Sequence, residues 1–241
     1  MRAFIWIITK IYNKMAKKKQ ETPKQEEAIG LDVQLNKSEA FIEKNWKVLA
    51  GALVAIIVVV SGIYLYKNYA AGKEVKAQAA IAAAQTAFAA QQYDQALKGE
   101  GANLGLLKVI DEYSGTKTAN LAKLYAAVCY ANTGKTDEAI KMFEDFSGKG
   151  DEMISPAAIG ALGNCYIQKG QNEKGVDLLL KAAKEADNDA ISPVFLLQAG
   201  EVYESLGQND KAVELYKQIK EKYFRSQLAS QIDMYIERAT K

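Results

Sequence analysis

The sequence contains no histidine, only two cysteines and three prolines, and almost equal numbers of acidic and basic residues. Without histidine, the chain lacks the commonest general base and the commonest ligand of transition metals. Two cysteines are too few for a zinc cluster or a disulfide framework. A net charge of +2 gives no reason to expect nucleic acid or an acidic partner. Abundant alanine favours a helix-rich protein.

The triplet Gly134-Lys135-Thr136 resembles the end of a phosphate-binding loop. Such a loop needs another glycine five residues earlier, so that its backbone can wrap the phosphates. Cys129 stands there instead. We therefore expect the chain to bind no nucleotide, and no other cofactor or metal. Acidic residues such as Asp111 and Glu138 have the pattern of helix-surface charges, and no nucleophile–base pair is evident, so we predict that the chain is not an enzyme.

One run of the sequence, Val48–Tyr66 (VLAGALVAIIVVVSGIYLY), is nineteen residues long and carries no charge. At about 1.5 Å per residue, a helix of this length reaches roughly 28 Å, enough to cross the core of a bilayer. A buried core helix seldom avoids charge over such a length, so we predict a membrane span. Aromatic and basic residues typical of membrane interfaces flank the run: Lys44, Trp46, Lys47, Tyr64, Tyr66, Lys67 and Tyr69.

A cleaved signal peptide is the alternative interpretation of this run. Its apolar core is longer than the usual length of about 7–15 residues, and no small-x-small cleavage site follows it. We therefore expect an uncleaved anchor over residues 44–68.

Basic residues predict the orientation of the anchor. Ten of them precede the span, whereas the twenty residues after it hold only Lys67, Lys73 and Lys76. The positive-inside rule then favours a cytoplasmic N-terminus, with the rest of the chain across the membrane. In a bacterium, that is an inner-membrane protein facing the periplasm. The ten are Arg2, Lys10, Lys14, Lys17, Lys18, Lys19, Lys24, Lys37, Lys44 and Lys47.

The N-terminal segment, residues 1–43, is expected to be a largely disordered cytoplasmic tail, since residues 16–38 are polar. Its short apolar patch, Phe4–Ile8, cannot span a bilayer. Two interpretations remain open: an interfacial helix, or translation that starts at Met15.

The remainder of the chain contains an internal repeat. Three segments align with spacings of 36 and 37 residues: KLYAAVCYANTGKTDEAIKMF, IGALGNCYIQKGQNEKGVDLL and LLQAGEVYESLGQNDKAVELY. The aligned glycines predict a helix hairpin in which glycine adopts the left-handed conformation after the first helix. We expect Asp137, Asn172 or Asp210 to help begin the second helix. The aligned residues are Tyr130, Tyr166 and Tyr203; Gly134, Gly170 and Gly207; Ala139, Gly175 and Ala212; and Phe143, Leu179 and Tyr216.

This pattern resembles the tetratricopeptide repeat. Ile159, Leu162, Gly163 and Tyr166 carry the resemblance, with Gly163 placed to allow close approach of two helices. Gly200 is its counterpart in the next repeat. The resemblance implies an all-α solenoid of helix hairpins.

Three features depart from the family's pattern. The tryptophan position holds Lys123, Ile159 or Leu196, and the period exceeds the usual value of about 34 residues. Asp151 and Asp187 stand where the closing proline falls. Ser155-Pro156 and Ser192-Pro193 instead predict a cap and first turn for each first helix.

Segments outside these repeats complete the predicted organisation. Residues 69–116 form an alanine-rich helix and a degenerate first hairpin, which is interrupted by the glycine-rich stretch KGEGANLG. Three repeats occupy residues 117–225. An amphipathic helix within residues 226–241 is expected to cap the stack.

A solenoid of this kind offers a groove built mainly from its first helices. We expect it to hold extended or partly unfolded chain segments, although these residues also fit a plain solvated face. A carboxylate clamp of lysines and asparagines is excluded, because only Asn164 matches one. Cys129 and Cys165 are interpreted as buried small hydrophobic residues rather than a disulfide. The candidate groove residues are Val128, Ala131, Asn132, Asn164, Ile167, Gln168, Glu201, Glu204 and Ser205.

The whole layout resembles the YfgM-like family of ancillary subunits of the bacterial SecYEG translocon. A short tail, one span near residue 50 and degenerate hairpins carry this likeness over about residues 38–241, with FIEKNWKVLAGALVAIIVVV. It implies an adaptor that joins the translocon to a periplasmic chaperone and receives secreted or outer-membrane chains. It brings no catalytic residues. A scaffold subunit of another envelope assembly complex, in outer-membrane or cell-wall biogenesis, is the alternative.

Overall fold

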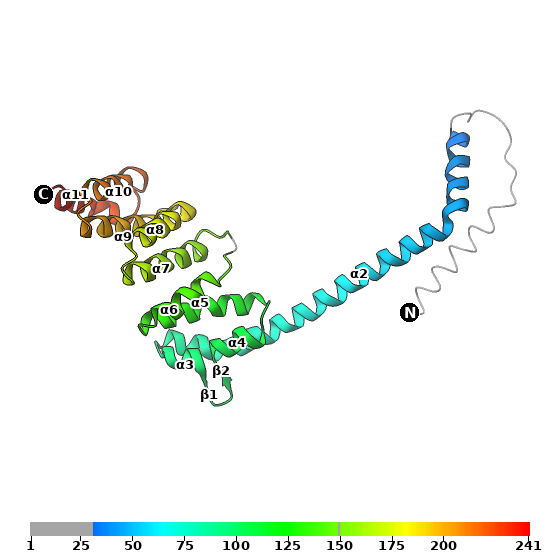
Figure 1. Cartoon of the computed structure of the whole chain (residues 1–241), viewed down its shortest axis with the longest axis horizontal. Helices are drawn as coiled ribbons and strands as arrows, with labels where there is room; N and C mark the ends of the chain where they lie inside the picture. Colours follow the sequence, from blue (N-terminus) through cyan, green and yellow to red (C-terminus); the bar gives the residue numbers. More distant parts are fainter. Residues whose placement is uncertain (1–30, 149) are drawn as a thin grey trace. The chain divides into compact units, whose positions relative to one another are not determined.

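The computed structural model describes residues 31–148 and 150–241, with side chains from residue 41 onward. The expectations for residues 1–30, including the start at Met15 and the patch Phe4–Ile8, lie outside the described residues. The described chain is a series of helices with one pair of very short strands (Figure 1). Its elements are α2 (Leu31–Ala89), α3 (Tyr93–Lys98), β1 (Gly99–Glu100), β2 (Asn103–Leu104), α4 (Leu106–Glu112), α5 (Lys117–Asn132), α6 (Thr136–Glu144), α7 (Ile154–Gln168), α8 (Asn172–Ala186), α9 (Ser192–Ser205), α10 (Asn209–Lys222), the 3-10 helix η2 (Gln227–Ser230) and α11 (Ile232–Thr240).

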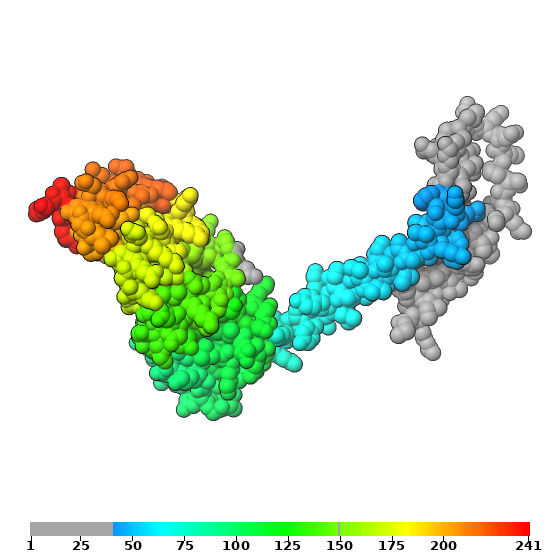
Figure 2. Space-filling model, viewed as in Figure 1, coloured from blue at the N-terminus to red at the C-terminus, as the bar shows by residue number. Residues whose placement is uncertain are grey.

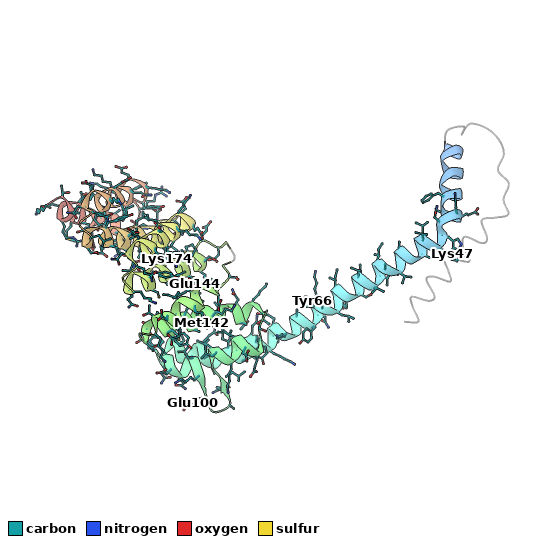
Figure 3. All side chains as sticks on the ribbon, in the orientation of Figure 1. Lys47, Tyr66, Glu100, Met142, Glu144 and Lys174 are labelled. Atoms are coloured by element: carbon teal, nitrogen blue, oxygen red, sulfur yellow. The ribbon has the colours of Figure 1, made fainter. Side chains whose placement is uncertain are left out.

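Helix α2 contains the uncharged run. It starts at Leu31, inside the segment expected to be a polar tail, since good helix formers such as Leu35, Glu39 and Ala40 continue into the run. Apolar side chains along Val48–Tyr66 are exposed, and Tyr66 is 71% exposed (Figure 3). Among the described residues, α2 is the helix long and apolar enough to cross a membrane. It is compatible with a single-pass anchor.

Three helix hairpins follow in chain order: α5/α6, α7/α8 and α9/α10. In the space-filling view, the elements from α3 to α11 succeed one another from green to red (Figure 2). The prediction for the turn glycines is confirmed, because Gly134, Gly170 and Gly207 have φ angles of 75°, 75° and 69°. Each turn also closes on a repeat tyrosine. Its carbonyl accepts a 2.9 Å hydrogen bond from the residue after the glycine: Tyr130 from Lys135, Tyr166 from Gln171 and Tyr203 from Gln208.

The residues expected to help begin the second helices do not act as their N-caps. The N-cap positions are Lys135, Gln171 and Gln208, none of which forms a side-chain cap hydrogen bond. The polar residues expected there lie one to two positions further along, inside the first turn. Acidic Asp137 and Asp210 can still favour the helix there through its dipole.

The starts of α7 and α9 also differ from the prediction, because Ser155 and Ser192 do not act as N-caps. Asp151 caps α7: its carboxylate accepts the backbone N–H groups of Met153 (3.0 Å), Ile154 and Ser155 (3.1 Å), and the Ser155 hydroxyl (2.6 Å). An acidic side chain two to four residues upstream reaches these N–H groups more directly than the serine hydroxyl does.

Asn188 has the corresponding role before α9. Its Oδ1 accepts the N–H groups of Ala190 (3.0 Å) and Ile191 (3.1 Å). Ser192 is instead fully buried and donates its hydroxyl to the carbonyl of Ala183, 2.9 Å away, at the end of α8.

A shortened hairpin precedes the three repeats. Here the left-handed turn position holds Gln91 (φ 59°) instead of glycine. After α3, strands β1 and β2 pair with Gly99 opposite Leu104 and make the interruption that the glycine-rich stretch predicted. The backbones cross so closely that a Cβ on Gly105 would lie 2.3 Å from the nitrogen of Gly99, so no side chain fits there.

The core consists of three clusters of buried residues along the stack. The first includes Ile81 of α2 and Leu106, the second centres on Phe143, and the third on Tyr216. Both cysteines are free and buried, as expected from their sequence context, with Cys129 in the first cluster and Cys165 in the second.

The C-terminal segment covers the last hairpin, but it is not the single helix that was expected. Ser226 accepts the N–H of Ala229 at 3.2 Å and closes a 3-10 turn, so that α11 starts only at Ile232. Ile232 is fully buried in the third cluster. The amphipathic character expected of this segment is otherwise present, since Leu228, Tyr235 and Ile236 pack against the same cluster.

Candidate protein-binding groove

The first helices α5, α7 and α9 present equivalent faces because the repeat spacing keeps them in register. Twelve positions, four on each helix, form what we call the first-helix face, and none of them is buried. Only Glu201 among the twelve is charged, although 25% of the whole chain is. The face therefore suits a partner held by packing and hydrogen bonds rather than by charge pairing. The twelve residues are Leu121, Tyr125, Val128, Asn132, Ala157, Ala161, Asn164, Gln168, Val194, Gln198, Glu201 and Ser205.

A cavity of about 250 Å³ opens on this face between α5 and α7. Phe143 and Cys165 are its buried lining residues. The volume lies below the range of about 300–1,000 Å³ typical of small-molecule sites, and it is of the size that one side chain of a partner would fill. Its other lining residues are Val128, Ala131, Asn132, Ala161, Asn164 and Gln168.

Amide side chains connect neighbouring repeats across the first-helix face. The Asn164 Nδ2 donates to Gln198 Oε1 (3.3 Å), and the Thr136 hydroxyl donates to Gln168 Oε1 (3.3 Å). Within residues 41–148 and 150–241, Asn164 Oδ1 and Gln168 Nε2 have no hydrogen-bond partner. An acceptor and a donor are therefore free for the backbone of a bound segment.

The structure brings five of the nine predicted groove residues together. The cavity between α5 and α7 is lined by Val128, Ala131, Asn132, Asn164 and Gln168.

The other four predicted residues lie outside that cavity. Ile167 packs over Gly175, where a Cβ would come within 2.4 Å of its Cγ1. Ser205 donates its hydroxyl to the carbonyl of Val202 (2.7 Å), and Glu201 is exposed on α9.

Glu204 takes part in a contact with the C-terminal helix. Its carboxylate accepts two hydrogen bonds from Arg238 of α11, at 2.8 and 3.0 Å, and one from the Tyr216 hydroxyl of α10 at 2.5 Å. The Arg238 guanidinium, aided by the Tyr216 hydroxyl, lowers the pKa of the carboxyl although burial opposes the shift. Glu204 therefore connects three helices.

Two of the residues of this face that sequence reasoning missed make contacts there: Ala161 lines the cavity, and Gln198 accepts the hydrogen bond from Asn164. Each lies three residues before a predicted groove residue, Asn164 or Glu201, and on the same side of its helix. Extending the helical spacing by one turn would have found both. No sequence signal singled out Phe143 as a lining residue of the cavity, since it aligns with core positions.

Charged groups near the second repeat are engaged in contacts of their own. The Tyr166 hydroxyl donates to Glu144 at 2.6 Å, and the Lys174 ammonium lies 3.7 Å from the centre of the Tyr166 ring (Figure 3). Lys169 pairs with Asp137 of the preceding hairpin.

The groups that could perform chemistry are sparse in the described residues. No cluster of three histidine, cysteine or acidic side chains that could hold a metal ion occurs there. Burial raises the pKa of the Cys129 thiol to about 11 and also raises that of Cys165. Both are therefore protonated at neutral pH, and the nucleophilic form of a cysteine is the thiolate.

Comparisons with known proteins agree with the fold. Two solved structures of TPR-like repeats from Podosopora anserina, assigned to a kinesin light chain, are similar to it; one of them is a single-substitution variant of the other. Each has a TM-score of 0.50 and 17% identity, and the match covers 68% of this chain and 90% of the other. At this identity, the likeness shows the fold alone. None of the curated proteins compared with the chain matches it.

A family model supplies the remaining comparison. The model of the tetratricopeptide repeat-like domain matches residues 39–238, which is most of the chain. Domains of this kind bind protein partners and act as adaptors. With its stacked hairpins, its turn glycines and this match, the chain belongs to the tetratricopeptide repeat-like family.

Proposed function

We propose that the chain is a membrane-anchored adaptor whose first-helix face binds an extended segment of a partner protein. The observation that carries this proposal is the cavity between α5 and α7, with the amide groups of Asn164 and Gln168 at its edge. The cavity would accept one side chain of the segment, and the amides would bond to its backbone. No catalytic step is assigned to the chain.

The choice of partner rests on chemistry and layout together. Because the face is nearly uncharged, a folded partner with a strongly charged surface fits it poorly. Partly unfolded segments instead expose backbone groups and apolar side chains at intervals. Secreted and outer-membrane proteins are such chains while they cross the membrane.

The location in the cell is proposed from the sequence. The exposed run on α2 would anchor the chain in the bacterial inner membrane, and the excess of basic residues before it would keep the N-terminus in the cytoplasm. The repeats would then lie in the periplasm. The likeness to the ancillary translocon subunits makes the SecYEG translocon and a periplasmic chaperone the first partners to test.

A scaffold role in another envelope assembly complex is the second candidate. It uses the same fold and the same groove, and it differs only in the partner.

Site-specific crosslinking tests the proposal in cells. A photo-crosslinking residue, p-benzoylphenylalanine, replaces Asn164 or Gln168 of the full chain. Matched controls carry it at Asp177 or Lys184, which are exposed on α8. We expect crosslinks to SecY, its neighbours or nascent envelope proteins from the two groove positions and not from the α8 positions.

The outcomes separate the candidates. Groove crosslinks to a different envelope assembly, without SecY above a control anchored by the same span, would replace the translocon adaptor with the scaffold. Equal crosslinking from α7 and α8 would contradict the groove itself.

A further inference from the structure

A second cavity lies where α2 passes the loop between α4 and α5. It has a volume of about 750 Å³ and is separate from the groove. Helix α2 contributes Tyr66, Lys67, Tyr69 and Lys73 to its lining. The loop contributes residues 114–116, and α5 contributes its first residue, Lys117. We call it the lysine pocket.

Hydrogen bonds hold the two walls of the lysine pocket together. The Lys73 ammonium donates to the carbonyl of Ser114 at 2.9 Å. The Glu74 carboxylate accepts the N–H of Lys117 (2.7 Å) and both the N–H (3.1 Å) and the hydroxyl (2.7 Å) of Thr118. These bonds join α2 to the start of α5, so the pocket is a formed feature of the fold rather than a gap beside a loose loop.

The pocket carries an excess of positive charge. Three lysines and one glutamate among its lining residues leave a formal charge of +2. Glu74 is already engaged by three donors. Within the part of the chain that the structure describes, the side chains of Lys67 and Lys117 form no ion pair or hydrogen bond. Both ammonium groups are thus free to contact an anion.

The position of the pocket along α2 indicates where such an anion would come from. The uncharged run ends at Tyr66, and Lys67 to Lys73 occupy roughly the next 10 Å of the helix. The headgroup layer extends about 5–8 Å beyond the hydrocarbon on each side. Tyrosines such as Tyr66 and Tyr69 are typical of this depth.

We propose that the lysine pocket binds the phosphate headgroup of an anionic phospholipid at the surface of the membrane in which α2 is anchored. The ammonium groups of Lys67, Lys73 and Lys117 would surround the phosphate, and the two tyrosine rings would lie beside the glycerol and the upper acyl chains. The site does not depend on what the first-helix face binds.

Lipid retention by the full-length chain in mild detergent tests this assignment. Native mass spectrometry counts bound phosphatidylglycerol and phosphatidylcholine for the wild type and for the double variant Lys67→Gln/Lys117→Gln. That variant keeps the Lys73–Ser114 contact and the Glu74 hydrogen bonds, so the pocket walls remain joined. We expect the wild type to prefer phosphatidylglycerol, and the variant to bind it about fivefold more weakly for each lysine removed.

A charge-matched control separates the site from general electrostatics. The variant Lys141→Gln/Lys184→Gln also removes two exposed lysines, from α6 and α8, and should retain the lipid as the wild type does. Unchanged phosphatidylglycerol binding by Lys67→Gln/Lys117→Gln, or equal loss in the control, would overturn the proposal. Binding of free glycerol 3-phosphate as tight as that of the lipid would also overturn it, because the pocket would then be a site for soluble phosphates.

Discussion

Gly200 illustrates how one missing methyl group sets the distance between two helices. A Cβ at this position of α9 would lie 2.3 Å from Cε1 of Tyr216 in α10, and Tyr216 is fully buried. The ring has no free space into which to move. The hydroxyl of the same tyrosine bonds to Glu204, so a shift of the ring would also disturb the contact with α11.

We expect Gly200→Ala to destabilise the fold by about 1–3 kcal/mol, the range for overpacking a filled core. Gly72→Ala is the matched control, because Gly72 lies in α2 with nothing within 4 Å of an added Cβ. Helix propensity alone would make that change stabilising by up to about 1 kcal/mol. Urea unfolding of the detergent-solubilised chain measures both, and a loss of stability in the control alone would contradict this account.

At the residue scale, the sequence allowed some conformations to be predicted and not others. Repetition identified Gly134, Gly170 and Gly207 as left-handed turn residues, and their φ angles agree. The left-handed conformation of Gln91 could not be predicted in this way, because glutamine rarely adopts it. Only an alignment of the degenerate hairpin with the repeats would indicate it. Nor could spacing decide between Asp151 and Ser155 as the cap of α7, since both side chains can reach the N–H groups of a first turn.

At the scale of elements, the stability of a helix depends on the groups that cap its first turn. In α7 a single carboxylate, that of Asp151, caps this turn. Hydrogen bonds from the Ser155 hydroxyl and from backbone N–H groups lower the pKa of Asp151 to about 2, from an ordinary value of 3.8. A carboxyl with a lowered pKa in the folded state stabilises the fold above its unfolded pKa. That contribution is complete above about pH 4 and is lost as the pH falls toward about 2.

Asp151→Asn should therefore lower the unfolding midpoint at pH 7, and the difference from the wild type should shrink as the pH falls from about 4 to about 2. Denaturant titrations across this pH range measure it. Asp189→Asn serves as the control, because Asp189 is exposed in the loop before α9. A pH-independent difference for Asp151→Asn would mean that the charge of the carboxylate does not stabilise α7.

Whole helices were more predictable than their ends. The internal repeat placed the three hairpins, because its aligned glycines mark the turn between the two helices of each one. The C-terminal segment had an amphipathic pattern, but the break at Gln231 depends on a local competitor. The Ser226 hydroxyl accepts the N–H of Ala229 and favours a 3-10 turn there.

At the scale of the whole molecule, the core of the solenoid is divided into three separate clusters, so each repeat packs mainly against the adjacent repeats. In such an architecture, each repeat is stabilised mainly by the repeats that it touches. Damage at one end should therefore remain close to that end.

Two substitutions at opposite ends test this independence. Ile232→Ala and Leu106→Ala each remove a fully buried side chain, from the third and the first cluster, and each should cost about 2–5 kcal/mol locally. Hydrogen exchange should show protection lost mainly in α9–α11 for Ile232→Ala and mainly in α3–α5 for Leu106→Ala. Uniform loss of protection in both variants would show that the stack unfolds as one unit.

The part of the candidate site that could be predicted is the part set by the repeat spacing. Repeat spacing placed Asn132, Asn164 and Gln168 on one face, and they line one cavity. The repeat spacing cannot show that a segment outside the repeats folds back onto a groove residue. Arg238 of α11 makes such a contact, because it donates a hydrogen bond to Glu204. Such contacts depend on the path of the C-terminal segment.

The buried thiols have a practical consequence for spectroscopy. Cys129 and Cys165 are 0% and 3% exposed, and burial raises the pKa of both. Maleimides react with accessible thiolates, so the native chain should remain unmodified by them while it is folded. One cysteine introduced at the exposed hairpin tip, for instance Ala102→Cys, could then carry a fluorophore or spin label without removal of the native cysteines. The rate of the slow labelling at Cys129 and Cys165 would in turn measure how often the first two core clusters open.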